Sequence, residues 1–122
     1  MQTAKIDLLE TYLSLYINHF EVLNHMDTKD SPYVILDVRN APSAVKKDQI
    51  KGALAIPAKD LPSKVNELNK EKTYVAYDWT SGTILGKQAL LILLKAGFKA
   101  YELGGALEGW KGMKLPIETL NE

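Results

Sequence analysis

The stretch TYVAYDWTSGTILGKQALLILLKAGFKAYEL, residues 73–103, decides the fold. It starts with a short apolar run at 73–77 and continues through a polar turn at 78–83. A nearly all-apolar segment follows at 84–96, and a second short run closes the stretch at 99–103. Short β-branched and aromatic runs between turn residues indicate buried strands, whereas the longer segment indicates a helix packed on several sides. A strand, a helix and a strand in succession predict two parallel strands joined by a crossover helix.

The rest of the chain continues this alternation. The predicted strands are 15–17, 33–38, 53–56, 73–77 and 99–103, and the predicted helices are 4–15, 18–26, 61–68, 84–96 and a short one around Trp110. Alternation of this kind predicts an α/β fold with a central, mostly parallel five-stranded sheet and helices on both faces. No linker or repeat divides the sequence. We therefore expect residues 1–122 to form a single domain, with residues 1–15 as an additional N-terminal helix.

Composition and charge narrow the class of protein. Hydrophobic residues make up 46% of the chain and charged residues 25%, which is typical of a globular protein. Fifteen basic residues balance fifteen acidic ones, so nothing favours binding to nucleic acid or to a membrane surface. The longest apolar run, 89–94, is too short to span a membrane, and Asp7 interrupts the region where a signal peptide would be apolar. We expect a cytoplasmic protein.

The chain contains no cysteine and only two histidines, His19 and His25. A thiolate nucleophile, a cysteine-based zinc site and a persulfide carrier are therefore all excluded. Two histidines are also too few for a multi-histidine metal cage. We expect neither a metal nor a cofactor.

Two pairs of residues mark the ends of predicted strands. Asp37 and Arg39 lie at the end of the run at 33–38, where an ion pair and hydrogen bonds would fix the next loop. We favour this structural role for Arg39 over substrate binding. Gly52 allows a tight turn before the short strand at 53–56, and Pro57 ends it.

A third set of residues closes the chain. Gly104 and Gly105 would allow backbone angles that other residues resist, and Trp110 is large enough to close one end of the core. Four segments together resemble the rhodanese (sulfurtransferase) family. They are the strand ending in Asp-Val-Arg at 35–39, the segment 50–57 that contains Gly52 and Pro57, the strand, loop and helix of 74–98, and the segment Leu-Gly-Gly-Ala-Leu-Glu-Gly-Trp at 103–110. The resemblance covers about 16–117. It implies a three-layer rhodanese-like fold whose active-site loop follows the strand at 73–77.

The resemblance places Asp78 where the family has its catalytic cysteine, which accepts sulfur from thiosulfate or a persulfide. We therefore assign no catalytic residue. The corresponding loop consists of Asp78, Trp79, Thr80, Ser81, Gly82 and Thr83. In the family, backbone N–H groups of this loop surround an anion; here we expect them to donate to the Asp78 carboxylate, in a loop open to water. Trp79 is either an exposed anchor for a partner or a packing residue.

Two functions remain open. The first is a catalytically inactive rhodanese-like domain that acts as a binding or regulatory module for an unknown protein or small anion. The alternative is phosphotransfer or hydrolysis at Asp78, because Asp-Trp-Thr-Ser-Gly-Thr is similar to the Asp-x-Thr-Gly-Thr loop of haloacid dehalogenase-like phosphatases. That chemistry needs a magnesium site, and only Glu102 and Glu108 lie near the next strand end. The sequence does not indicate the oligomeric state.

Overall fold

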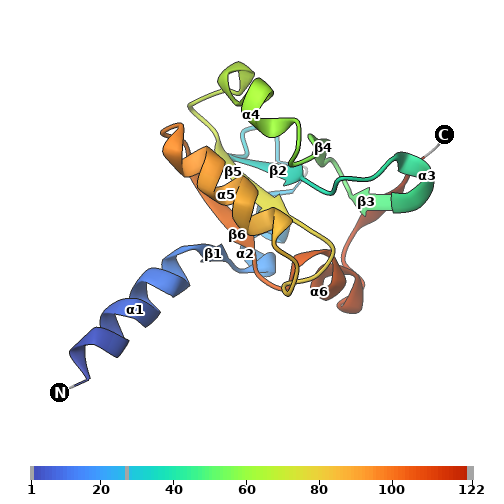
Figure 1. Ribbon diagram of the computed structural model, residues 1–122. Coiled ribbons are helices and arrows are strands. Elements are labelled where there is room, and N and C mark those ends of the chain that lie inside the picture. The colour runs from blue at the N-terminus through green and yellow to red at the C-terminus, as the bar shows by residue number, and fades with distance from the viewer. Residues whose placement is uncertain (1, 27, 121–122) are drawn as a thin grey trace.

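The computed structural model describes residues 2–26 and 28–120 and contains a five-stranded parallel sheet (Figure 1). The strand order is β1-β6-β5-β2-β4. The strands are β1 (Tyr16–Ile17), β2 (Tyr33–Asp37), β4 (Leu54–Ala55), β5 (Thr73–Tyr77) and β6 (Lys99–Leu103). All four neighbouring pairs run parallel, so the predicted α/β fold is confirmed.

The register of the sheet brings three strand ends together. β2 pairs with β5 along its whole length, so that Asp37 lies opposite Tyr77. On the other side of β5, Ala76 lies opposite Glu102 of β6. Parallel strands end at the same edge of a sheet, which is where α/β proteins usually place their functional groups. Asp37, Asp78 and Glu102 are therefore all located at this carboxyl edge.

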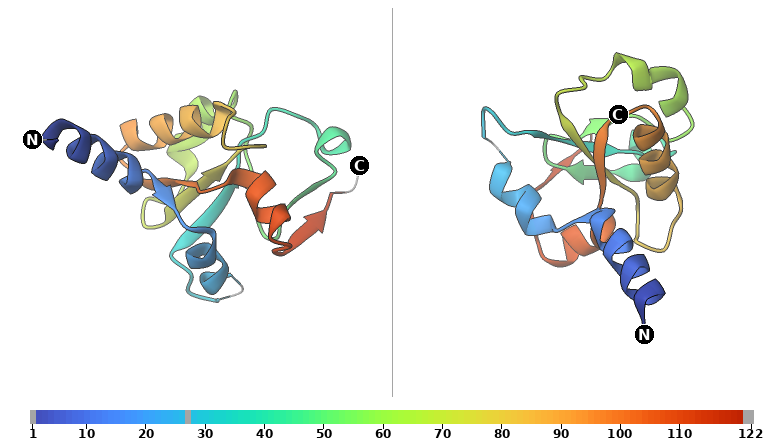
Figure 2. Two further views of the ribbon diagram at one scale, coloured as in Figure 1. Left: turned by 90° about the horizontal axis from the view of Figure 1, so that it is seen from below. Right: turned by 90° about the vertical axis from the view of Figure 1, so that its left-hand side faces the viewer.

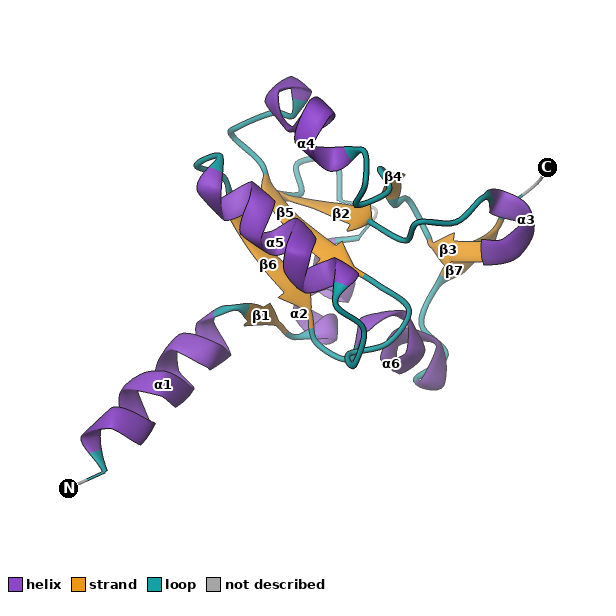
Figure 3. Ribbon diagram, in the orientation of Figure 1, coloured by secondary structure: helices purple, strands orange, loops and turns teal. Residues whose placement is uncertain are grey.

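Helices cover both faces of the sheet, as predicted (Figure 2, Figure 3). One face is covered by α2 (His19–His25) and α6 (Ala106–Gly112), and the other by α4 (Leu61–Lys64), the 3₁₀ turn Val65–Glu67 and α5 (Leu85–Lys95). The side chain of Asn18 caps α2 by accepting a hydrogen bond from the N–H of Phe20 at 2.7 Å. Within the described residues, none of the helices combines the length and the apolar character needed to cross a bilayer.

The core has two halves, one on each face of the sheet. Ile35 and Val75 pack in the half that contains Trp110, which is fully buried. Leu36 and Ala76 point to the opposite face. This alternation follows from the two-residue period of a strand and buries both strands on both sides. The predicted burial of these central residues and of Trp110 is confirmed.

Three short elements were not predicted. They are α3 (Ser43–Lys46), β3 (Asp48–Ile50) and β7 (Ile117–Thr119). β3 and β7 form a separate two-stranded antiparallel sheet (Figure 3). Glu118 of β7 helps to hold this small sheet against the rest of the molecule, since its carboxylate accepts a hydrogen bond from the N–H of Gly52 at 2.7 Å.

The predicted N-terminal helix is present as α1 (Thr3–Ser14). It extends away from the sheet and its covering helices (Figure 1, Figure 2). None of its residues is buried.

Candidate functional site

The carboxyl end of β2 carries a buried network around Asp37. Arg39 is also fully buried, and its guanidinium binds Asp37 through Nη2–Oδ2 at 2.7 Å and Nε–Oδ1 at 3.0 Å. The Tyr77 hydroxyl donates to Asp37 Oδ2 at 2.8 Å and accepts the N–H of Ile50 at 3.1 Å. Arg39 Nη2 also donates to the carbonyl of Asp48. This network ties β2, β5 and β3 together, a wider structural role than the fixing of the next loop that we predicted for Asp37 and Arg39.

Charge and burial act against each other in this network. Burial alone lowers the pKa of Arg39, but the hydrogen bonds and the negative charge of Asp37 outweigh it and raise the pKa above the ordinary value. Burial raises the pKa of Tyr77, and the charge of Asp37 raises it further. At neutral pH the arginine is charged and the tyrosine is neutral. Neither group is therefore prepared for proton transfer.

Asp78 follows β5 directly, and its side chain is fully buried. Its Oδ1 accepts the N–H of Trp79 at 2.7 Å, and its Oδ2 accepts the N–H of Gly86 at 3.2 Å. Gly86 lies in the first turn of α5, where backbone N–H groups have no partner within the helix. The predicted attraction of this carboxylate to backbone donors is confirmed. The prediction of a loop open to water at this position was wrong, because the carboxylate is enclosed beneath α5.

The loop after Asp78 binds largely to itself. The Thr83 hydroxyl donates to the Thr80 carbonyl at 2.7 Å, and the Gly82 N–H donates to the Thr80 hydroxyl at 3.2 Å. These side-chain hydroxyls thus occupy the polar groups of the loop backbone. Ser81 accepts a hydrogen bond from Lys87 at its carbonyl. The carbonyls of Asp78 and Trp79 accept N–H groups from the first turn of α6.

Trp79 is half-buried and stacks on Arg39, whose guanidinium carbon lies 4.5 Å from the indole ring centroid. Trp79 also lines a pocket of about 330 Å³. The pocket is lined by Lys46, Asp48, Trp79, Thr80, Leu107, Glu108 and Lys111. Trp79 therefore packs against the domain on one side, while part of its surface stays accessible in the pocket. Its role as a partner anchor remains a prediction.

Glu102 is a site residue that the sequence analysis did not single out as such. Glu102 is buried next to Asp78, and both side chains lie against Gly86. A Cβ added at Gly86 would lie 2.6 Å from Glu102 Oε2 and 3.5 Å from Asp78 Cβ. Burial raises the pKa of Glu102, the nearby charge of Lys87 opposes this rise, and the charge of Asp78 adds to it. The signal in the sequence was a glutamate between the apolar residues Tyr101 and Leu103 of a predicted strand.

The remaining motif residues have structural roles. Gly52 and Gly105 adopt positive φ angles of 80° and 83°, which favour glycine. Gly104 does not; there, a Cβ would lie 3.2 Å from the carbonyl oxygen of Ile17, so the constraint is close packing. Pro57 follows β4, and its carbonyl starts the next turn. Trp110 closes the core, and its Nε1–H donates to the carbonyl of Pro116 at 2.8 Å.

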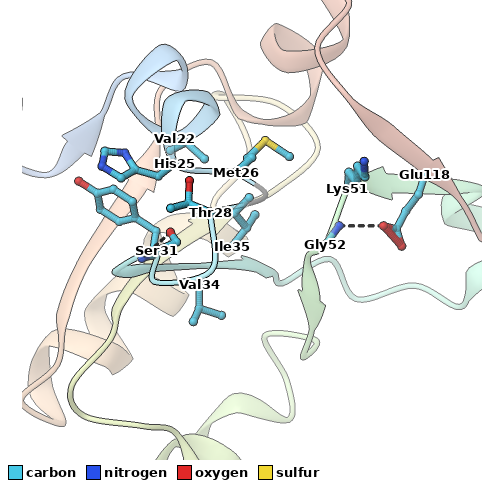
Figure 4. Close-up of a pocket in the computed structure, with 11 residues that line it drawn as sticks. Val22, His25, Met26, Thr28, Ser31, Val34, Ile35, Lys51, Gly52 and Glu118 are labelled. Atoms are coloured by element: carbon cyan, nitrogen blue, oxygen red, sulfur yellow. Dashed lines mark hydrogen bonds between the residues drawn. The ribbon is translucent and has the colours of Figure 1, made fainter.

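A second pocket, of about 340 Å³, lies between α2 and the start of β2 (Figure 4). Val22, Met26 and Ile35 give it an apolar wall, and Gly52 and Glu118 are joined by a hydrogen bond at its far side. It contains none of the loop residues 78–83. Across residues 2–26 and 28–120, no group of three or more acidic or histidine side chains is arranged to hold a metal ion.

Comparisons with known proteins agree with this architecture. The family model of the rhodanese-like domain matches residues 20–113. The full-length protein from Lactobacillus plantarum is 68% identical over 98% of this chain and 100% of its own, with a TM-score of 0.95. The rhodanese-like domain of an Anabaena protein is 29% identical over 87% of this chain and 80% of its own, with a TM-score of 0.72.

A rhodanese-related protein from Thermoplasma volcanium shares the fold, with a TM-score of 0.72 at 21% identity over 84% of this chain and 96% of its own. No curated protein matches the sequence. The matched family region contains the Asp37 network, the loop after β5 and Trp110, whereas α1 and β1 lie outside it. The chain belongs to the rhodanese-like domain family, as a member that has no cysteine.

Proposed function

We propose that this protein is a rhodanese-like binding module that does not transfer sulfur. The observation that carries the proposal is the state of Asp78. The family resemblance assigns this position to the catalytic cysteine, and here it is a buried carboxylate held by the backbone N–H groups of Trp79 and Gly86. Sulfur transfer needs a thiolate that can form a persulfide, and a carboxylate does not replace it.

The pocket beside Trp79 supports a protein partner. Its lining combines an accessible indole with two lysines, Lys46 and Lys111, and two acidic residues, Asp48 and Glu108. Such a mixed lining suits a polypeptide surface better than a small anion, because the acidic groups repel an anion. Aromatic side chains are frequent anchors at protein interfaces. We assign the partner contact to Trp79 and this pocket.

Phosphotransfer at Asp78 is less well supported by the geometry. A nucleophilic carboxylate needs one oxygen directed at the substrate, but both oxygens of Asp78 accept backbone hydrogen bonds in an enclosed position. Glu108 lines the pocket beside Trp79, and Glu102 packs against Gly86. The described residues do not bring them together with Asp78 as a set of metal ligands.

The absence of sulfur transfer is tested by the thiosulfate:cyanide assay. Purified wild-type protein should not exceed the blank, and Asp78→Cys should gain at most weak activity, because the loop also lacks the arginine that the family often has there. Persistent turnover by the wild type after removal of contaminating enzymes would refute the proposal.

Partner binding is tested by affinity capture from the native cell lysate. Wild type should retain a specific protein that Trp79→Ala loses, whereas Phe20→Ala, which removes another exposed aromatic residue that does not line the pocket, should retain it. Thermal unfolding of both variants checks that they are folded. Equal retention by all three proteins would show that the Trp79 surface is not the contact.

The single-domain organisation and the cytoplasmic location expected from the sequence remain predictions.

A further inference from the structure

α1 presents an apolar surface that has no partner within the described chain. Five large apolar side chains of this helix are between 51% and 68% exposed. They are Ile6, Leu8, Leu9, Tyr12 and Leu13. Ile6, Leu9 and Leu13 form one stripe by their spacing, and the other two widen it on one side. A helix of this length is marginal on its own, and a contiguous apolar patch of this kind usually marks an interface.

α1 does not fold back onto its own domain, because its exit is fixed. Only Leu15 separates the helix from β1, and β1 pairs with β6. The carbonyl of Leu15 itself accepts the N–H of Glu102 at 2.8 Å. The rings of Tyr12 and Tyr16, one on each side of the junction, lie 5.1 Å apart. The described elements of the same chain therefore do not supply the surface that covers α1.

A matching surface exists on α5 of the same chain. Ile84, just before the helix, and Leu91 and Leu94 within it are between 43% and 60% exposed and follow one side of the helix. α1 and α5 are also similar in length, about 18 Å and about 16.5 Å at the helical rise per residue.

The charges of the two helices are complementary. Besides Lys5, α1 carries two acidic residues, Asp7 and Glu10. α5 carries Lys95 and Lys87, whose ammonium lies 3.4 Å from Glu102 of the same chain, and no acidic residue. Unlike charges around apolar stripes favour pairing of α1 with α5 over pairing of two copies of α1, in which the acidic residues would repel each other.

We propose that the occupant of the α1 surface is a second copy of this chain, in a two-fold dimer in which each α1 packs on the α5 of the other copy. The eight exposed side chains contribute on the order of 100 Å² each when covered. That corresponds to roughly 800 Å² per copy, the usual size of a specific interface. A two-fold axis makes the contact twice from the same two surfaces. The inference is independent of the proposed partner contact at Trp79, which lies at the carboxyl edge of the sheet.

Sedimentation velocity of the full chain tests the dimer. At roughly 100 µM, where an interface of this size is expected to associate, the wild type should sediment as a dimer. Leu9→Glu in α1 and Leu91→Glu in α5 should each raise the dissociation constant by at least about 30-fold. Met113→Glu, which places the same charge at an exposed apolar position directly after α6, should leave the dimer intact.

Mixing the two variants distinguishes the proposed exchange from other dimers. In the mixed dimer, one contact joins the intact α1 of Leu91→Glu to the intact α5 of Leu9→Glu, and the second contact holds both glutamates. Because one contact is intact, an equimolar mixture should dimerise more tightly than either variant alone and less tightly than the wild type. Circular dichroism confirms that both variants are folded, which their exposed positions make the expected result. A monomeric wild type would overturn the proposal. A fully dimeric Leu91→Glu would also overturn it, because it would show that α5 is not the surface.

Discussion

Asp37 and Asp78 are two fully buried carboxylates at the ends of neighbouring strands, and they are neutralised in different ways. Asp37 binds the guanidinium of Arg39 and the hydroxyl of Tyr77, with the Lys46 ammonium 3.8 Å away. Among residues 2–26 and 28–120, Asp78 has two backbone N–H groups as hydrogen-bond partners, and the charged side chain that packs near it is another carboxylate, Glu102.

This difference distinguishes a carboxylate that supports the fold, Asp37, from one that lies in the candidate site, Asp78. A carboxylate bound by a buried cation is part of a closed network and cannot be exchanged for another group without leaving that cation unpaired. A carboxylate bound by backbone donors at the start of a helix occupies a place that suits any small anion. Asp37 therefore maintains the fold of this family member, whereas we propose that Asp78 fills the position that the family's reactive group occupies.

The largest effect should come from removing the cation at Asp37. Arg39→Leu removes the guanidinium that binds this buried carboxylate directly and leaves the Lys46 ammonium, 3.8 Å away, as its nearby positive charge. We expect a loss of about 3–5 kcal/mol in the free energy of unfolding. Urea denaturation at pH 7 measures it. The double variant Asp37→Asn/Arg39→Leu should lose less than the single one. A loss below about 1 kcal/mol in Arg39→Leu would remove the contrast with Asp78.

The next effect concerns the space shared by Asp78 and Glu102. Gly86→Ala would normally stabilise a helix by up to about 1 kcal/mol. Here the new Cβ would lie 2.6 Å from Glu102 Oε2, so we expect a net loss of about 1–3 kcal/mol from overpacking. In a Glu102→Ala background the same substitution should become neutral or stabilising. Equal losses in both backgrounds would show that the backbone, and not Glu102, limits the space.

A smaller effect is expected at Asp78 itself. Asp78→Asn keeps one acceptor but turns an amide N–H₂ toward a backbone N–H, which should cost about 1–2 kcal/mol at pH 7. Asp30→Asn, at an exposed position, is the matched control and should have no effect beyond about 0.5 kcal/mol. If Asp78→Asn is as stable as the wild type or more stable, repulsion from Glu102 exceeds the two hydrogen bonds, and the carboxylate does not stabilise the loop.

The pH dependence of Glu102 gives the finest distinction. Its pKa is raised in the folded state, so the folded state holds its proton more tightly than the unfolded state. The resulting stability is complete below the unfolded pKa of about 4.3 and is lost as pH rises through the folded pKa. Relative to the wild type, Glu102→Gln should therefore become more stable as pH increases from 4 to 8. A stability difference that is constant over this range would contradict the assignment.

The sequence predicted the parts of the fold that depend on local patterns. β5 and β6 were recognisable because turn residues bound their apolar runs, as at Asp78 and Gly104. β3 and β7 were missed because their residues are mostly polar, and the contact between Glu118 and Gly52 joins positions 66 residues apart. Local periodicity contains no information about such a contact.

The site was predictable to a smaller degree. The ion pair of Asp37 with Arg39 followed from a short spacing at the end of a strand. The enclosure of Asp78 was not predictable from the sequence. It depends on how α5 packs over the carboxyl edge and on the close approach that a glycine at position 86 allows. Glu102 looked like a strand residue whose direction the sequence leaves open.

The most direct test of the account is rescue of Asp78→Ala by formate, the smallest free carboxylate. We predict that formate binds the vacated N–H groups of Trp79 and Gly86 and raises the free energy of unfolding of Asp78→Ala. The gain should be about 1.4 kcal/mol at a concentration roughly ten times its dissociation constant, relative to sodium chloride at equal ionic strength. The wild type, whose own carboxylate already occupies these donors, should show no such gain. If formate stabilises both proteins equally or neither of them, Asp78 does not fill an anion site, and the central claim fails.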